Sequence, residues 1–270
     1  MKIEIYYFSG TGNSLHIARE LQKQIPDSEL IPIVKMLGRD SIKTEAQAVG
    51  FVFPIYMTTI PNPVKRFIQK LDLLDKTQYI FAIANRLGTS HGAFFEIEKI
   101  LKKKGKTLNS QFTITMPSND PKFNYNIPTE EYIADLETTL QKKLPAIAEV
   151  IIKRENAKEK DIEAQDKIPT FLLKVVPHII ALTNKMGMDY KMFADSKCGG
   201  CGICEKVCLS KKIKMENGKP IWQKDIECFL CSACINFCPN KAIQIKSFKT
   251  EKNGRYSHPY ATVEDISNEK

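Results

Sequence analysis

Hydrophobic and polar positions in the N-terminal half of the chain form a repeating order of short apolar runs and longer stretches with helical spacing. Apolar runs of strand length stand at 3–8, 28–33, 48–53, 79–84 and 110–116. Between the first two runs, from Leu15 to Ile25, apolar residues recur at helical spacing, and similar patterns surround 64–68 and 94–104. Strands that alternate with helices predict an α/β domain, a doubly wound parallel sheet of five strands.

The centre of the chain has a different pattern. A charged stretch with helical spacing covers 129–167. An apolar segment follows at 171–182, and it is interrupted by Lys174, Pro177 and His178. It is too short and too broken to span a bilayer. We expect this segment to pack between two domains, with binding at a membrane interface as the alternative.

Composition and charge narrow the function classes. Apolar residues make up 43% of the 270 residues, which is enough for a sizeable core. The formal net charge is +9, but the basic runs at 102–106 and 153–154 stand at predicted helix ends, where the helix dipole favours cations. We therefore favour solvated helix ends over nucleic-acid binding. No transmembrane run or secretory signal is evident, so the sequence predicts a cytoplasmic protein.

The loop at 9–14, Ser-Gly-Thr-Gly-Asn-Ser, joins the first predicted strand to the first predicted helix. A glycine-rich loop at a helix N-terminus points backbone N–H groups and the positive end of the helix dipole at one place, which suits an anion. No lysine follows Gly12, so this is not a Walker A loop, and Leu15 replaces the third glycine of a dinucleotide fingerprint. The hydroxyl and amide groups instead predict a terminal monophosphate, with a bare turn as the alternative.

The same loop resembles the FMN-phosphate loop of flavodoxins. That resemblance implies FMN at the carboxyl edge of the sheet, where loops 54–63 and 85–93 also lie. It implies that Tyr56 lies against the flavin ring, although an ordinary loop tyrosine is the alternative. Arg86 is a candidate for the flavin N1 side, where a positive charge would favour the anionic reduced ring. The predicted cofactor-binding residues are Ser9, Gly10, Thr11, Gly12, Asn13, Ser14, Pro54, Ile55, Tyr56, Met57, Asn85, Arg86, Gly88 and Thr89. His91 is interpreted as a surface residue.

All eight cysteines lie in two runs that repeat after thirty positions. They are Cys198, Cys201, Cys204 and Cys208, then Cys228, Cys231, Cys234 and Cys238. Each run is C-x₂-C-x₂-C-x₃-C, the bacterial ferredoxin pattern for two [4Fe–4S] clusters, in which the fourth cysteine ligates the other cluster. Cluster one is thus predicted to take Cys238, and cluster two Cys208. Zinc and disulfides explain the third close cysteine poorly.

Taken as a whole, the chain resembles the flavodoxin–ferredoxin fusion family. The resemblance implies a flavodoxin-like FMN-binding domain at 1–154, a helical connector at 155–194, a small α+β ferredoxin domain at 195–247 and a tail at 248–270. Residues Tyr256, Pro259, Tyr260 and Val263 predict that the tail is a docked extended segment.

The predicted function is electron transfer between FMN and two [4Fe–4S] clusters, which interconverts one- and two-electron carriers. This makes the chain an oxidoreductase of anaerobic metabolism with an undefined donor and acceptor and no catalytic residue beyond the flavin. The alternative is a non-catalytic electron relay or redox sensor in a larger complex. The expected partner is a redox protein, such as an acidic ferredoxin or flavodoxin, or a small acceptor; the oligomeric state stays open.

Overall fold

The computed structural model describes residues 2–56, 59–88, 92–122, 127–159, 191–246, 248 and 250–270. Its N-terminal part, the sheet domain (residues 2–159), contains a five-stranded sheet with the strand order β2-β1-β4-β6-β7. All neighbouring strands in it are parallel. The strands are β1 (Ile3–Tyr7), β2 (Ser28–Pro32), β4 (Ala48–Pro54), β6 (Tyr79–Arg86) and β7 (Ser110–Thr115). The predicted doubly wound parallel sheet is confirmed.

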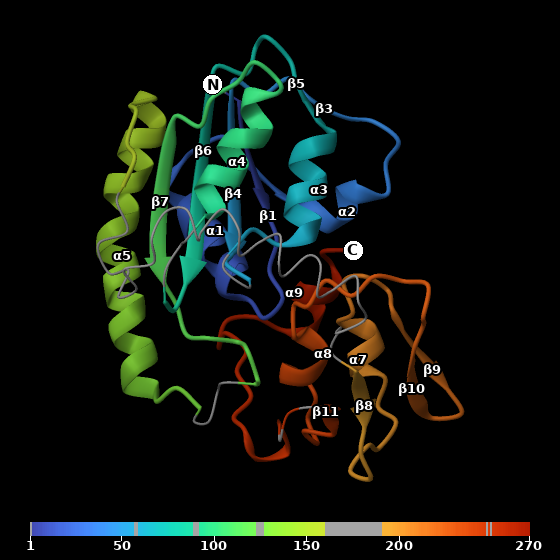
Figure 1. Cartoon of the computed structure of the whole chain (residues 1–270). Coiled ribbons are helices and arrows are strands. Elements are labelled where there is room, and N and C mark those ends of the chain that lie inside the picture. The colour runs from blue at the N-terminus through green and yellow to red at the C-terminus, as the bar shows by residue number, and fades with distance from the viewer. Residues whose placement is uncertain are drawn as a thin grey trace.

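Helices cover both faces of this sheet (Figure 1). One face carries α1 (Asn13–Gln24) and α5 (Glu130–Lys153), whose apolar residues share a core with inward-facing residues of the strands. The other face carries α2 (Ile33–Leu37), α3 (Asn62–Lys70) and α4 (Ala93–Lys102). The short strands β3 (Ile42–Thr44) and β5 (Leu71–Leu73) pair with each other beside this second layer. Apolar surface is therefore buried on both faces of the central strands, as their near-continuous apolar sequences require.

The α5 helix is shorter than the sequence pattern predicted. It ends at Lys153, because Arg154 adopts a left-handed backbone conformation with a φ of 55°. Its N-terminus is capped by the side chain of Thr129, which accepts a hydrogen bond from the backbone of Tyr132. The apolar segment at 171–182 and most of the predicted connector lie outside the described residues. The helical connector therefore stays a prediction.

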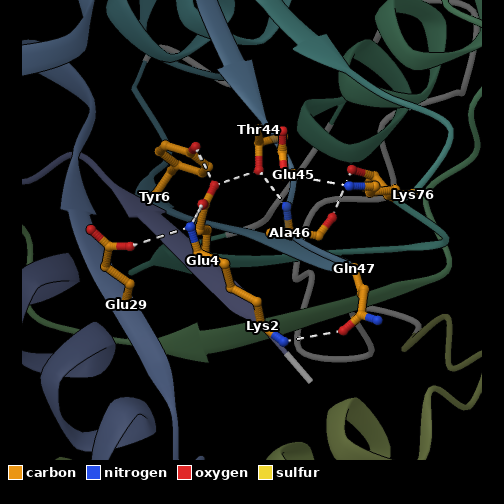
Figure 2. Close-up of polar contacts among 10 residues, drawn as sticks. Lys2, Glu4, Tyr6, Glu29, Thr44, Glu45, Ala46, Gln47 and Lys76 are labelled. Atoms are coloured by element: carbon orange, nitrogen blue, oxygen red, sulfur yellow. Dashed lines mark hydrogen bonds and ion pairs between the residues drawn. The ribbon is translucent and has the colours of Figure 1, made fainter.

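A buried carboxylate ties β3 to β1 (Figure 2). Glu4 is only 5% exposed, and it accepts hydrogen bonds from Tyr6 at 2.6 Å and Thr44 at 2.5 Å. Its other oxygen pairs with Lys2 at 2.8 Å. Burial alone would raise the pKa of Glu4, but these three partners outweigh it and hold the pKa below the ordinary 4.5. This network braces β1 well before its carboxyl end, where the predicted phosphate loop begins.

The cysteine domain (residues 191–246) lies beside the carboxyl ends of the sheet strands (Figure 1). It contains two antiparallel pairs and two short helices. The elements are β8 (Met192–Ala194), α7 (Ile203–Lys206), β9 (Ile213–Glu216), β10 (Lys219–Trp222), α8 (Ala233–Asn236) and β11 (Ile243–Ile245). The predicted small ferredoxin-type domain is confirmed as a fold.

The two domains share one apolar core. Val207, Leu209 and Ala233 of the cysteine domain belong to the same buried cluster as the residues under α3 and α4. Leu209 follows Cys208 at the position where Pro239 follows Cys238 in the second run, and it is 2% exposed in this core. The leucine side chain therefore packs between the domains.

The C-terminal segment contains the short 3₁₀ helix η1 (Thr250–Lys252) and the helix α9 (Val263–Ser267) and runs along the junction of the two domains (Figure 1). Tyr256 is buried, as expected for a docked segment, whereas Tyr260 is 64% exposed. Val263 begins a helix instead of continuing an extended chain. Thr262 and Asp265 form a capping box there, a feature that the sequence pattern carries but that the prediction missed.

Candidate functional site

The loop between β1 and α1 is shaped to receive an anion. Gly12 precedes the helix with a φ of 101°, a left-handed conformation that glycine adopts without strain. The Gly12 N–H donates to Ser9 Oγ at 3.0 Å, which folds the loop back on itself. No side chain caps α1, so no capping group occupies the N–H groups of its first turn. This arrangement fits the terminal phosphate that the sequence predicted.

A cavity of about 230 Å³ opens beside this loop. Among the predicted cofactor residues that the structure describes, all except Gly12 line it. They are Ser9, Gly10, Thr11, Asn13, Ser14, Pro54, Ile55, Tyr56, Asn85, Arg86 and Gly88. Gly12 instead packs against the tail, because a Cβ there would lie 2.3 Å from Ala261 Cβ. Met57 and Thr89, together with His91, lie outside the described residues.

Two further segments line the cavity and were not predicted. One is the loop after β7, which contributes Pro117, Ser118, Asn119 and Asp120. A polar loop after the fifth strand had to reach the same sheet edge, so the topology could have indicated it. The other is the cysteine domain, through Leu230 and Ser232. No local sequence signal marks this second segment as part of a flavin site.

Two of the three hydroxyl groups at the loop, those of Thr11 and Ser14, differ in their partners. Thr11 Oγ1 accepts a hydrogen bond from the Asn119 amide at 3.0 Å, so its own proton stays available to a ligand. Ser14 Oγ donates its proton to Asn85 Oδ1. Thr11 therefore keeps a hydroxyl proton for a ligand, as does Ser9, which accepts from the Gly12 N–H, while Ser14 connects the loop to β6. Thr11 and Ser14 should contribute unequally to binding a phosphate.

Tyr56 lines the cavity and packs against the core that the two domains share. Its hydroxyl lies 3.4 Å from the Asn119 amide and close to Gly10. Its ring meets Phe8 edge-on, with 6.2 Å between ring centroids. Burial raises the pKa of the Tyr56 hydroxyl, and the nearby Cys231 adds to this. The Tyr56 hydroxyl thus contacts the loop at 9–14, and the position of the Tyr56 ring against the flavin stays a prediction.

Arg86 brings a buried positive charge to the cavity wall. It stands at the end of β6 and is 7% exposed. Its guanidinium donates to Thr115 Oγ1 at 2.9 Å, which fixes its direction from the neighbouring strand β7. A fixed cation beside a flavin favours a reduced, anionic ring. The approach of Arg86 to the flavin N1 stays a prediction.

The structure gathers the cysteines into two groups, and each takes its fourth member from the other run. The first cysteine group, Cys198, Cys201, Cys204 and Cys238, lines one small cavity. The second cysteine group, Cys208, Cys228, Cys231 and Cys234, lines another. These are the same two sets that the sequence assigned to clusters one and two. Ligation itself stays a prediction.

The surroundings of the thiols fit a cationic iron–sulfur core. Burial, with the nearby Cys238 thiol adding to it, raises the pKa of Cys204 to about 11. Burial also raises the pKa of Cys234 well above its ordinary value, and the other thiols of its group raise it further. Crowded, buried thiols release their protons when metal ions supply compensating positive charge. The donor set therefore suits metal-bound thiolates.

The flavin cavity and the second cysteine group adjoin. A Cβ on Gly10 would lie 2.3 Å from the carbonyl oxygen of Cys231, so the phosphate loop rests directly on a cysteine backbone. Ser232 lines both the flavin cavity and the cavity of the second group. The first group does not line the flavin cavity, and its Cys201 is exposed. The second group thus lies between the flavin cavity and the first.

The tail fixes this junction through contacts with both domains. Tyr256 donates its hydroxyl to Asn13 Oδ1 at 3.0 Å, while its N–H donates to Asn236 Oδ1 at 2.9 Å. The His258 N–H donates to the Thr11 carbonyl at 2.8 Å. Glu269, fully buried, accepts from the Ser9 N–H at 3.1 Å. Hydrogen bonds from the tail therefore fix the backbone of the loop at 9–14.

His258 also stacks on His16 of α1, with ring centroids 4.2 Å apart and planes 24° from parallel. His16 Nε2 lies 2.7 Å from Glu137 of α5. Donor atoms of the three residues lie within 4.8 Å of one another. The near-parallel rings contact each other through their faces, so we assign this group a packing role. This trio anchors the tail to the sheet domain.

Comparison with known proteins agrees with both halves of the chain. A family model described as a flavodoxin domain matches residues 4–124, and one described as a 4Fe-4S dicluster domain matches residues 197–243. The chain belongs to the flavodoxin–ferredoxin fusion proteins. The flavodoxin domain implies FMN, and the dicluster domain with its eight cysteines implies two [4Fe–4S] clusters. The chain is therefore an electron-transfer flavo-iron–sulfur protein.

Two curated relatives match short stretches of this chain. An uncharacterized ferredoxin from Methanocaldococcus jannaschii is 43% identical over 60 residues, which are 21% of this chain and 77% of that protein. One component of an ion-translocating oxidoreductase complex from Methanosarcina acetivorans is 30% identical over 69 residues. That match covers 26% of each chain, so this chain spans about a quarter of the length of that relative.

Solved flavoprotein structures match the sheet domain weakly. A putative flavoprotein from Bacteroides uniformis is 15% identical with a TM-score of 0.36, covering 53% of this chain and 97% of its own. An FMN-dependent NADH-azoreductase from Bacillus anthracis is 9% identical with a TM-score of 0.36, covering 55% and 100%. These scores add nothing to the sheet order already described. Within the described residues, no helix is long and apolar enough to cross a membrane.

Proposed function

We propose that this protein transfers electrons between an FMN in the cavity of the sheet domain and the two cysteine groups, and so connects two-electron with one-electron carriers. When bound, FMN exchanges electrons in pairs or singly, whereas a [4Fe–4S] cluster exchanges one at a time. The observation that carries the proposal is the contact of Gly10 with Cys231, since it joins the phosphate loop to a predicted cluster ligand.

The proposed order of the sites runs from the cavity to the second cysteine group, then to the first group and the surface. Ser232 borders both the cavity and the second group. Cys204 of the first group and Cys234 of the second pack in one buried cluster. Cys201 is exposed, which supports exit at the first group. The chain's own residues thus support an order of three adjoining sites.

The proposed exit carries basic side chains. Lys219 donates to the Cys198 carbonyl at 2.9 Å, and the exposed Lys197 directly precedes Cys198. By contrast, the basic run at 102–106 lies at the opposite edge of the sheet. There the ammonium groups of Lys104 and Lys106 donate hydrogen bonds to backbone carbonyls. An acidic redox protein is therefore expected to dock beside the first cysteine group, not at the helix ends.

The test is photoreduction of the FMN in anaerobic holoprotein, with flavin absorbance and cluster EPR signals followed together. We expect flavin reoxidation to match the appearance of reduced clusters within the same molecule, at a rate independent of protein concentration. A rate that rises with protein concentration would show transfer between molecules. Clusters that stay oxidised while the flavin stays reduced would refute the proposal.

A second candidate function is supported by one of the relatives. The matching relative is one component of an ion-translocating complex, which suits a relay protein that docks to a larger assembly. Purification of tagged protein from native extract distinguishes the two. A stoichiometric complex without turnover of small acceptors by the free chain favours the relay. Turnover of quinones, viologens or NAD(P)⁺ by the free chain favours an oxidoreductase.

A further inference from the structure

The two cysteine runs repeat in backbone conformation as well as in sequence, and this exposes a difference between them. Gly200 and Gly202 of the first run have φ values of 73° and 76°. Thirty positions later, Leu230 and Ser232 have φ values of 54° and 58°. Glycine adopts this left-handed region freely, but leucine and serine do so against a steric penalty. The second run therefore keeps two strained side chains where the first has none.

Available space explains only part of this difference. A Cβ on Gly200 would lie 2.8 Å from the Gly218 carbonyl oxygen, so glycine is required there. A Cβ on Gly202 would meet nothing within 4 Å. At the pair Gly202 and Ser232, only the backbone conformation disfavours a side chain. The space available at this position therefore does not explain why the second run has a serine and the first a glycine.

The positions of the two strained residues supply that reason. Leu230 and Ser232 stand on either side of Cys231, and both line the flavin cavity. Among the described residues of the cysteine domain, these two line the flavin cavity. Ser232 also borders the second cysteine group. Strained conformations that persist in folded proteins concentrate at functional sites, where the side chain is needed.

We propose that Leu230 and Ser232 are FMN-contacting residues, and that their left-handed conformations are retained for the side chains they bring to the flavin site. The inference rests on the proposed function, and it adds two residues of the cysteine domain to a flavin site otherwise formed by the sheet domain. Leu230 supplies an apolar wall that keeps water from the side of the cavity facing the second cysteine group. Ser232 supplies a hydroxyl at the boundary of the two sites.

The repeat also provides a matched control. Lys211 and Lys241 occupy equivalent positions three residues after the two runs, with φ values of 60° and 50°. Both are exposed, and neither lines the flavin cavity. The substitution Lys241→Gly therefore relieves the same kind of backbone strain in the same domain without changing the cavity wall. Any effect of glycine itself on the domain will appear in this variant.

The experiment measures the FMN dissociation constant and the accessibility of the flavin to iodide in anaerobic protein with both clusters verified by iron content and EPR. We expect Leu230→Ala and Leu230→Gly to raise the dissociation constant about tenfold and to increase iodide accessibility. Ser232→Ala and Ser232→Gly should raise it about 3–10-fold through the lost hydrogen bond. Lys241→Gly should match the wild type in both measurements.

The outcomes separate this inference from the proposed function. Wild-type affinity and iodide accessibility in the Leu230 and Ser232 variants, with normal flavin-to-cluster transfer, would overturn the inference alone. Failure of the wild type to bind FMN would remove the proposed function as well. An equal loss of affinity in Lys241→Gly would attribute the effect to the backbone and also refute the role of the side chains.

Discussion

Gly10 and Cys231 lie so close that no side chain fits between them: a Cβ on Gly10 would lie 2.3 Å from the Cys231 carbonyl oxygen and 2.8 Å from its Cβ. These residues are far apart in the sequence and belong to different domains. Their contact joins a loop built for an anion to a backbone that carries a predicted cluster ligand. Under the proposed function, electrons pass between the flavin site and the second cysteine group across this contact.

Substitution of Gly10 tests this contact. Gly10→Ala must push the two backbones apart, and overpacking of this kind destabilises by about 1–3 kcal/mol. We expect slower flavin-to-cluster transfer in flash photoreduction and a lower denaturation midpoint. Gly88→Ala is the control, because Gly88 also lines the cavity but a Cβ there meets nothing within 4 Å. Equal transfer rates in the two variants would contradict the assigned route.

Local sequence patterns predicted the sheet and the phosphate loop because their information is local. Apolar periodicity marks each strand, and the loop at 9–14 carries its own chemistry. The partners Leu230 and Ser232 were missed, since nothing in a cysteine run indicates that its intervening residues face another domain. The tail contact of Tyr256 with Asn13 was missed for the same reason. Contacts between residues so far apart in the sequence depend on how the folded domains dock, which local patterns do not encode.

The crossed grouping of the cysteines makes a kinetic prediction. Cys208 stands in the first run but lines the cavity of the second group, next to the flavin cavity. Cys208→Ala should therefore impair the first transfer from the flavin. Cys238→Ala should leave that step intact and block onward transfer to external acceptors. Flash photoreduction with cluster EPR resolves the two steps, and the reverse pattern would show that each run ligates its own cluster.

Thr11 and Ser14 should contribute unequally to FMN affinity. Thr11→Val removes a free hydroxyl donor, and hydrogen bonds to charged groups are worth about 1.5–3 kcal/mol, so we expect a loss of about 10–100-fold. Ser14→Ala removes a hydroxyl already bonded to Asn85 and should cost less. Titration of FMN fluorescence measures both. Asn119→Ala separates the lost Thr11–Asn119 bond from the lost phosphate contact, and a larger effect of Ser14→Ala would refute this ranking.

The Glu4 network predicts an acid-sensitive contribution to stability. The folded-state pKa of Glu4 lies below its ordinary value, so its contribution is present above about pH 4.5 and is lost as the pH falls through the folded value. Glu4→Gln should lower the unfolding free energy by about 1–3 kcal/mol near neutral pH, with a smaller difference in acid. Denaturant titrations at several pH values measure this. Glu29→Gln, at a carboxylate 3.8 Å from the same Lys2, should change little.

Docking of an acidic partner at the first cysteine group should depend on salt. The formal charge of +9 falls to about +3 in the holoprotein, because each cluster with its thiolates adds roughly −2 and the FMN phosphate adds up to about −2. The remaining attraction is local and is screened over about 10 Å at 0.1 M salt. We expect the rate of electron exchange with an acidic ferredoxin or flavodoxin to fall as ionic strength rises. Lys197→Gln should lower the rate at low salt and flatten the dependence, whereas Lys102→Gln, at the opposite edge of the sheet, should leave both unchanged. A rate that is flat or rises with salt in the wild type would exclude electrostatic docking at this surface.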